Sequence, residues 1–202
     1  MNVRRAGESA LLVEVADLGS VLALSAAFRD EAIEGVLEVV PAARTVLLLC
    51  DPDASSLDAV ADSVRRIRPS DHRPWLEEVV EIPVSYDGPD TEDVVSLTGM
   101  SRQQLIDWHT GATWHVAFSG FAPGFGYLVT DDARSIPRKD TPRTTVPAGS
   151  VGLAGEFSGV YPRASPGGWQ LIGRTAVTLL DVAADPPTLL RPGIEVRFVD
   201  QT

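Results

Sequence analysis

Residues 113–128 have the sequence TWHVAFSGFAPGFGYL, in which a short apolar run leads into a loop of alternating glycines and aromatic residues. The surrounding stretch, residues 111–173, contains eleven of the 17 glycines of the chain, together with frequent prolines. Many short strands joined by Gly/Pro turns are typical of a β-barrel or a β-sandwich. The strands expected here are Thr113–Phe118, Gly152–Ala154 and Gln170–Ile172, with Glu195–Val199 as the last strand.

The residues before position 77 have a different pattern, in which strand-like runs alternate with amphipathic segments of helical periodicity. The order β-α-β-β-α predicts a small α+β sandwich of ferredoxin-like type. The polar, Pro-bracketed residues 68–74 are typical of a linker, so we predict two domains, 1–76 and 77–202. The strands expected in the first domain are 8–15, 36–40 and 45–50, and the helices are 18–33 and 55–67.

Charge and composition exclude several classes of protein. The chain has 28 acidic and 17 basic residues and a formal net charge of -11, which disfavours binding to nucleic acid or to an anionic membrane surface. The longest purely apolar run, Val46–Cys50, is far shorter than the roughly 20 residues of a membrane-spanning helix. Since the N-terminus lacks the apolar stretch of a secretory signal, a cytoplasmic protein with a buried, unpaired Cys50 is expected.

Residues 77–107 are strongly acidic, with eight carboxylate side chains and one basic residue, Arg102. Such a segment forms either a solvated face or a docking surface for a basic partner. Residues 77–84 are expected to form a strand and Ser101–His109 a short helix. Ser101 and Gln104 have the spacing of a capping box at the start of that helix.

The loop at residues 119–127 is the first candidate for a binding site. Its glycines allow the backbone to approach a ligand closely, and its aromatic rings could form the wall of an apolar pocket. The alternative is a tight barrel corner packed by its own aromatic residues. The candidate binding residues are Gly120, Phe121, Pro123, Gly124 and Phe125.

Residues 137–143 form a second candidate, because two arginines, Arg138 and Arg143, lie five residues apart in a Pro-rich loop. Residues 134–174 contain six basic side chains and only two acidic ones, in a chain that is acidic overall. Arginine forms bidentate contacts with carboxylate and phosphate, so this local charge predicts an anion site. In the alternative interpretation, each arginine pairs with an acidic residue elsewhere in the fold.

Two further Gly/Ser loops, residues 146–152 and 165–169, offer backbone amides and hydroxyls that could hold an oxyanion, or they form structural turns. The candidates in these loops are Ser150, Ser165, Gly167, Gly168 and Trp169.

His109 is a candidate acid/base group. In the alternative interpretation it interacts with the dipole at the C-terminal end of the predicted helix Ser101–His109. His109 and His115 are six residues apart, which does not match the i, i+4 spacing of ligands on a helix face, and no metal site is predicted.

Several of these segments together resemble one family. GFAPGFGYL at residues 120–128 is similar to the hallmark GFxPGFxYL of the 5-oxoprolinase B-subunit family, also called allophanate hydrolase subunit 1 or the KipI-type kinase inhibitor family. The other matching segments follow in the family's order, and the resemblance spans essentially the whole chain. Residues 86–91 depart from it, because the family's GGxxGPDL stretch is shortened here. The other matching segments are 82–86, 137–143, 147–152, 161–169 and 172–175, together with His109.

This resemblance implies an N-terminal α+β domain followed by a cyclophilin-like β-barrel. It also implies a non-autonomous component of an ATP-dependent 5-oxoprolinase, which converts 5-oxoproline, ATP and water to glutamate, ADP and phosphate. The implied partners are the homologous, KipA-like C subunit and the A subunit of that enzyme. ATP with magnesium is expected in the complex, and no cofactor is expected on this chain alone. The alternatives are a regulatory protein that inhibits a histidine kinase, or a component that hydrolyses allophanate or another urea-derived amide.

The enzymatic interpretation assigns roles to the candidate residues. Arg138 and Arg143 would neutralise a carboxylate or phosphate. Backbone amides of residues 120–126 and 167–168 would hold the polarised oxygen, and His109 would assist proton transfer.

Overall fold

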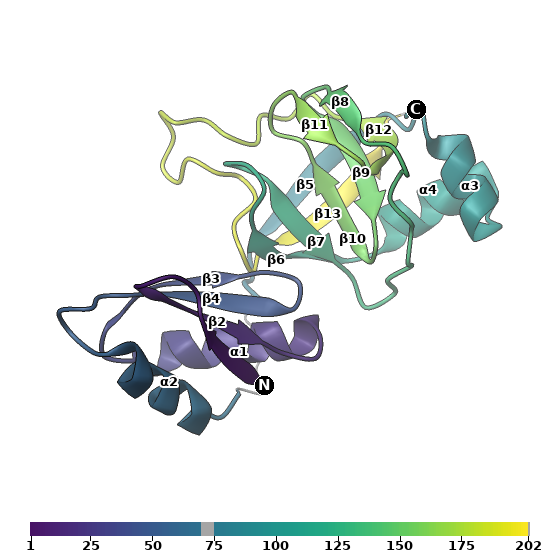
Figure 1. The fold of residues 1–202 in the computed structure, drawn as a ribbon. Coiled ribbons are helices and arrows are strands. Elements are labelled where there is room, and N and C mark those ends of the chain that lie inside the picture. Colours follow the sequence, from purple (N-terminus) through teal and green to yellow (C-terminus); the bar gives the residue numbers. More distant parts are fainter. Residues whose placement is uncertain (70–74, 202) are drawn as a thin grey trace. The chain divides into compact units, whose positions relative to one another are not determined.

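The computed structural model describes residues 1–69 and 75–201, which form two compact units, Met1–Pro74 and Trp75–Thr202 (Figure 1). The division falls two residues before the predicted boundary between 76 and 77. Leu76 belongs to the second unit, where its backbone amide donates to the carbonyl of Gly193 at 2.8 Å. Most of the predicted linker, residues 70–74, lies outside the described residues.

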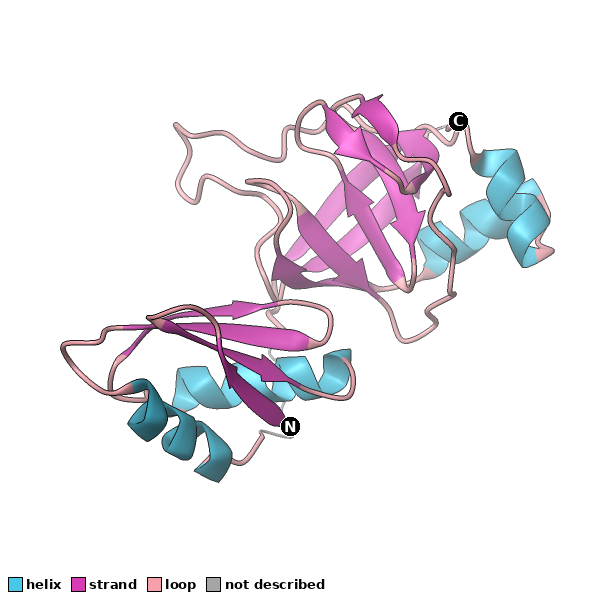
Figure 2. Ribbon diagram, viewed as in Figure 1, coloured by secondary structure: helices cyan, strands magenta, loops and turns pink. Residues whose placement is uncertain are grey.

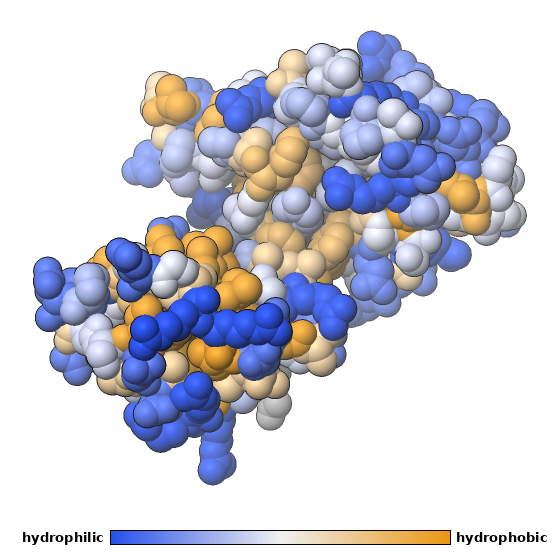
Figure 3. All heavy atoms as spheres, in the orientation of Figure 1, coloured by the Kyte–Doolittle hydropathy of each residue, from blue (hydrophilic) through white to orange (hydrophobic). Residues whose placement is uncertain are grey.

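The first unit is a four-stranded antiparallel sheet in the order β1-β2-β4-β3, with both of its helices packed on one face (Figure 2). Alternation along the strands turns Leu11 and Val13 of β2 and Val46 and Leu48 of β4 toward the helices. Apolar residues also reach the surface of this unit (Figure 3). The elements are β1 Asn2–Arg5, β2 Ala10–Glu14, α1 Leu18–Asp30, β3 Val36–Pro41, β4 Thr45–Cys50 and α2 Leu57–Arg66.

The predicted strands and helices of the first unit are present, with shifted ends. Ser56 caps α2 by accepting a hydrogen bond from the amide of Ala59, and Cys50 is buried and unpaired as expected. Strand β1 was not predicted and occupies the sheet edge beside β2. Among the described residues of this unit no strand follows α2, and the ferredoxin-like assignment stays a prediction.

The second unit is built on a seven-stranded sheet in the order β12-β9-β10-β7-β6-β13-β5, which curls into a nearly closed barrel (Figure 1). Ser85, just after β5, and Arg174 of β12 join the two ends of this sheet through a pair of backbone hydrogen bonds of 2.9 Å each. The strands are β5 Val79–Val84, β6 Trp114–Ser119, β7 Gly126–Val129, β9 Ser150–Ala154, β10 Phe157–Val160, β12 Gln170–Arg174 and β13 Glu195–Asp200.

Closure of the barrel requires a glycine at position 173. A Cβ atom there would lie 2.7 Å from the carbonyl oxygen of Ser85, and the register of β12 against β9 shifts between Leu171 and Gly173. This bulge brings β12 to the edge of β5. A separate two-stranded sheet pairs β8, Arg143–Val146, with β11, Ser165–Gly167. The prediction of a β-barrel in the second half of the chain is therefore confirmed.

Two helices lie next to the barrel, α3 at Thr91–Thr98 and α4 at Arg102–Gly111. The capping box predicted for α4 is present: the Ser101 hydroxyl accepts from the amide of Gln104, and the Gln104 side chain accepts from the amide of Ser101. Helix α3 was not predicted, because it lies in the acidic segment 77–107, which was interpreted only as a solvated face or a docking surface. Among the described residues, no helix has the length and apolar character needed to cross a membrane.

Candidate functional site

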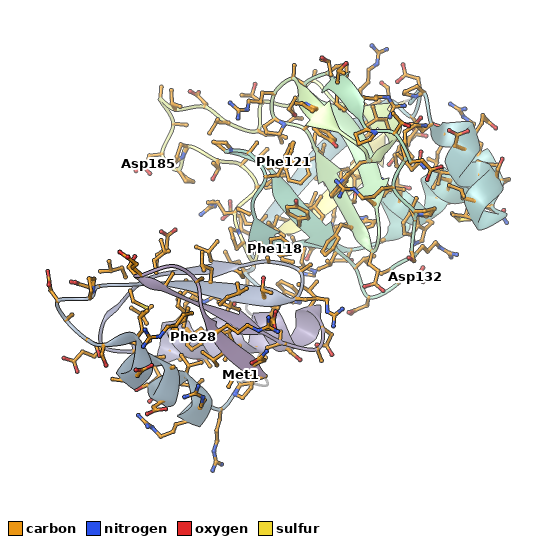
Figure 4. The ribbon with its side chains drawn as sticks, viewed as in Figure 1. Met1, Phe28, Phe118, Phe121, Asp132 and Asp185 are labelled. Atoms are coloured by element: carbon orange, nitrogen blue, oxygen red, sulfur yellow. The ribbon has the colours of Figure 1, made fainter. Side chains whose placement is uncertain are left out.

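The Gly/aromatic loop between β6 and β7 is a tight corner with one exposed ring. Pro123 and Gly124 occupy the centre of a turn in which the amide of Phe125 donates to the carbonyl of Ala122 at 3.0 Å. Gly124 has a φ of 82°, as the third residue of a type II turn requires. Phe121 also adopts a positive φ, 65°, and is 56% exposed (Figure 4).

Behind this corner lies an aromatic cluster formed by Phe125, Tyr127, Tyr161 and Trp169. The rings pack edge to face, and the centroid of Phe125 lies 5.3 Å from that of Trp169 and 5.5 Å from that of Tyr161. Phe125 and Trp169 are 1% and 5% exposed. The rings of Phe125 and Trp169 are therefore part of the hydrophobic core, which corrects their prediction as binding residues.

The loop at residues 137–143 is held by a buried carboxylate, Asp90, which was not predicted as a site residue. It is buried at the start of α3, where it forms an ion pair with Arg143 and accepts hydrogen bonds from Lys139 Nζ at 2.8 Å and the amide of Leu171 at 2.7 Å. Burial raises the pKa of Asp90, but the hydrogen bonds from Arg143, Lys139 and Leu171 outweigh it and hold this pKa below its ordinary value. Arg143 thus has an internal partner, and the alternative interpretation is correct for this residue.

Arg138 is different, because it is exposed and forms no ion pair with any residue that the structure describes. It lines an open cavity of about 570 Å³ between α3 and residues 137–141, to which Gln170 of β12 also contributes. Burial raises the pKa of Tyr127 and that of Tyr161, and the positive charge of Arg138 opposes both shifts. Because Arg138 is exposed and has no ion-pair partner among the described residues, its guanidinium is available to an anion.

His109 lies in the barrel core rather than at a surface. It is fully buried, with Nδ1 2.7 Å from the hydroxyl of Tyr86, Nε2 2.9 Å from that of Ser158, and its ring stacked on Phe198. Burial lowers the pKa of His109 to about 3, so the ring is neutral at pH 7. Both nitrogens are occupied within the core, which corrects the expectation of an accessible acid/base group.

The structure brings residues 137–143 together with the Gly/Ser loop at residues 165–169. Gly167 pairs with Arg143 across the β8–β11 sheet, and the amide of Lys139 donates to the carbonyl of Gly168 at 2.8 Å. Ser165 begins β11 in the same sheet, whereas Ser150 is buried at the start of β9.

Sequence reasoning missed Asp90, Lys139 and Gln170, whose side chains bond to residues between 33 and 81 positions away in the chain. Among the described residues, no group of three or more His, Cys, Asp or Glu side chains is arranged to hold a metal ion.

Residues 1–190 match the family described as "Carboxyltransferase domain, subdomain C and D", and the chain belongs to this family. It is 43% identical over 171 residues to the 5-oxoprolinase B subunit of Escherichia coli O157:H7, covering 82% of this chain and 78% of that protein. It is 36% identical over 219 residues to the 5-oxoprolinase B subunit of Bacillus subtilis strain 168, covering 98% and 91%.

Solved structures agree with the fold. The crystal structure of TTHA0988 is 34% identical, with a TM-score of 0.76; the match covers all of this chain but only 40% of that one. The urea amidolyase of Kluyveromyces lactis is 21% identical with a TM-score of 0.77, covering 99% of this chain and 15% of that one, and shows the fold alone.

Proposed function

We propose that this chain is the B subunit of an ATP-dependent 5-oxoprolinase and that it acts with the A and C subunits of that enzyme. The observation that carries the proposal is the identity of 36% over nearly the whole chain, and of 43% over most of it, to proteins named as 5-oxoprolinase B subunits. The reaction converts 5-oxoproline, ATP and water to glutamate, ADP and phosphate. ATP and magnesium belong to the assembled enzyme in this proposal, and no cofactor is assigned to this chain alone.

The reaction requires a positive charge near the substrate, which a surface of this chain can supply. 5-Oxoproline carries a carboxylate, and ATP-dependent opening of its ring places further negative charge on the amide oxygen, so a free cation is needed near the substrate. Arg138 meets that need, because its guanidinium has no ion-pair partner among the described residues. Arg143 has a structural role instead, because its ion pair with Asp90 fixes the loop that carries Arg138.

The proposal includes finer expectations. The first unit is taken as ferredoxin-like and the barrel as cyclophilin-like, the enzyme as cytoplasmic, and the chain as inactive without its partners. Inhibition of a histidine kinase and hydrolysis of a urea-derived amide stay as alternatives, and the names of the two relatives above favour 5-oxoproline over both.

Reconstitution tests the proposal. The chain is purified with the candidate A and C subunits encoded in the same genome, and glutamate is measured after addition of 5-oxoproline and ATP, with each chain omitted in turn. We expect glutamate only from the complete mixture. An assembled complex that releases no glutamate would refute the proposal. A fall in autophosphorylation of a cognate histidine kinase on addition of this chain would favour the regulatory alternative.

A further inference from the structure

We propose that the corner at residues 120–125 and a hairpin arm at residues 180–188 together form the docking surface for a second protein chain. The arm extends away from the strands of the barrel (Figure 1), and the corner carries the exposed ring of Phe121. Phe121 was predicted from the sequence as a binding residue, whereas residues 180–188 were not singled out there.

The arm is a short hairpin with its own backbone hydrogen bonds. Leu180 pairs with Thr188, and the amide of Asp181 donates to the carbonyl of Pro187 at 2.8 Å. All seven residues of the tip, 181–187, are exposed, and five of them carry apolar side chains. Val182 alone is 88% exposed. A hydrogen-bonded segment that holds a run of apolar side chains in water is typical of a surface that a partner covers.

An unusual turn holds Phe121 at the surface. The amide of Ala122 donates to the carbonyl of Gly120 at 2.7 Å, so Phe121 is the central residue of a γ-turn. Its φ of 65° belongs to the rare form of this turn, which is unfavourable for a residue with a Cβ atom. The ring packs edge to face on Phe125 and Tyr161, with centroids 5.4 and 6.0 Å away, and the residue remains 56% exposed. Backbone strain of this kind is concentrated at binding sites, where it presents a side chain in a fixed position.

The corner and the base of the arm pack against each other. A Cβ atom on Gly124 would lie 3.0 Å from the Cβ of Leu180, and one on Gly126 would lie 3.1 Å from the Cβ of Leu190. The two glycines therefore allow the arm to lie directly on the corner. Leu179 and Leu190 fix the base of the arm in the barrel core, where they are 2% and 1% exposed. The tip and the exposed ring of the corner lie on the same side of the barrel (Figure 4).

The side chains of this surface indicate the chemistry of the partner. Aromatic and aliphatic anchors such as Phe121 and Val182 contribute most to affinity when they fill apolar pockets. The tip also has two carboxylates, Asp181 and Asp185, and no basic residue lies within 181–187. The face of the partner is therefore expected to combine apolar pockets with basic side chains.

The comparisons indicate which chain this partner is. In TTHA0988 the fold of this chain is part of a longer polypeptide, because the match covers only 40% of that protein. The 5-oxoprolinase B subunit of Bacillus subtilis is matched over 91% of its length, so there the fold is a separate subunit. A separate subunit needs a non-covalent surface in place of the covalent link. The partner proposed here corresponds to the rest of TTHA0988, and its identification with the C subunit rests on the proposed function.

The test measures binding of the full chain to the protein of the same genome that matches the remaining part of TTHA0988. Isothermal titration calorimetry compares the wild type with Phe121→Gly and Val182→Asp. Glycine removes the ring and adopts a positive φ without strain, and Val182→Asp changes only the exposed tip. We expect each variant to raise Kd about tenfold or more. The control Leu37→Asp, at a 71% exposed side chain of the first unit, should keep the wild-type Kd.

Urea unfolding of each variant shows that the fold is intact, and the glutamate assay separates this inference from the proposed function. Wild-type Kd for both Phe121→Gly and Val182→Asp overturns the docking surface, while glutamate release by the complete mixture leaves the proposed function standing. If the mixture is inactive but binding depends on both residues, the docking surface stands and the proposed function fails. A partner that does not bind the wild type also overturns the surface. Self-association of the chain that Val182→Asp abolishes would assign the surface to a second copy and overturn the partner named here.

Discussion

Replacing Asp90 with alanine is expected to destabilise the second unit by about 2–3 kcal/mol. Removing one partner of a buried ion pair typically costs about 3–5 kcal/mol, because the other partner loses its compensation. Asp90 has a side chain that is only 3% exposed, but those of Lys139 and Arg143 are 26% and 25% exposed and can recover part of their hydration. The expected cost therefore lies at or below the lower end of that range.

Urea unfolding followed by tryptophan fluorescence measures this change. All four tryptophans, at positions 75, 108, 114 and 169, belong to the second unit, so the signal reports on that unit alone. The control is Asp87→Ala, whose partner Arg174 is largely exposed; loss of this surface pair should cost less than about 1 kcal/mol. An Asp90→Ala free energy of unfolding within about 0.5 kcal/mol of the wild type would refute the role given to Asp90.

The loss of stability caused by Asp90→Ala is expected to depend on pH. The folded-state pKa of Asp90 lies below its ordinary value of 3.8, so the carboxylate stabilises the fold fully above that value. The contribution is lost as pH falls through the folded-state pKa. The difference in unfolding free energy between wild type and Asp90→Ala should therefore shrink below about pH 4. A difference that stays constant down to pH 2 would contradict this linkage.

Three other predictions use the same structure. Phe125→Ala should lower the free energy of unfolding by about 3–5 kcal/mol because its ring is buried, while Phe121→Ala should cost less than about 1 kcal/mol; equal losses in urea unfolding would be inconsistent with their burial. Gly173→Ala should cost about 1–3 kcal/mol through its clash at the barrel closure, whereas Gly111→Ala, with open space around its Cβ, should be neutral or stabilising. His109 should show no protonation between pH 5 and 8 in nuclear magnetic resonance, and because its folded-state pKa is about 3, its contribution to stability should fall as pH drops below about 6.5; an ordinary titration near pH 6.5 would exclude its buried position.

Local patterns predicted most of the fold. Helical periodicity and caps such as Ser56 and Ser101 act within a few residues, so they can be recognised in the sequence and are present in the structure. Strand β1 has an exposed face and only one neighbouring strand, which leaves too weak an apolar pattern to predict it. Helix α3 was missed for a related reason, because its acidic residues, which include Glu92 and Asp93, suggested only a solvated surface.

The candidate site was less predictable, because it depends on contacts between distant residues. Asp90 and Arg143 are 53 positions apart, and no local pattern indicates that a buried carboxylate will engage one arginine and leave Arg138 free. The burial of His109 depends likewise on Tyr86 and Ser158, from two other parts of the barrel. Arg138 remains a candidate site residue, and Gln170, which lines the same cavity, is a further one that the structure shows.

Simultaneous measurement of ADP and glutamate in the reconstituted complex is the decisive experiment. The chain is mixed with its candidate A and C subunits, and both products are followed over time with and without 5-oxoproline. Our proposal predicts equal amounts of ADP and glutamate, formed only when 5-oxoproline and this chain are both present. Equal product formation in a mixture that lacks this chain would contradict its assignment as the B subunit.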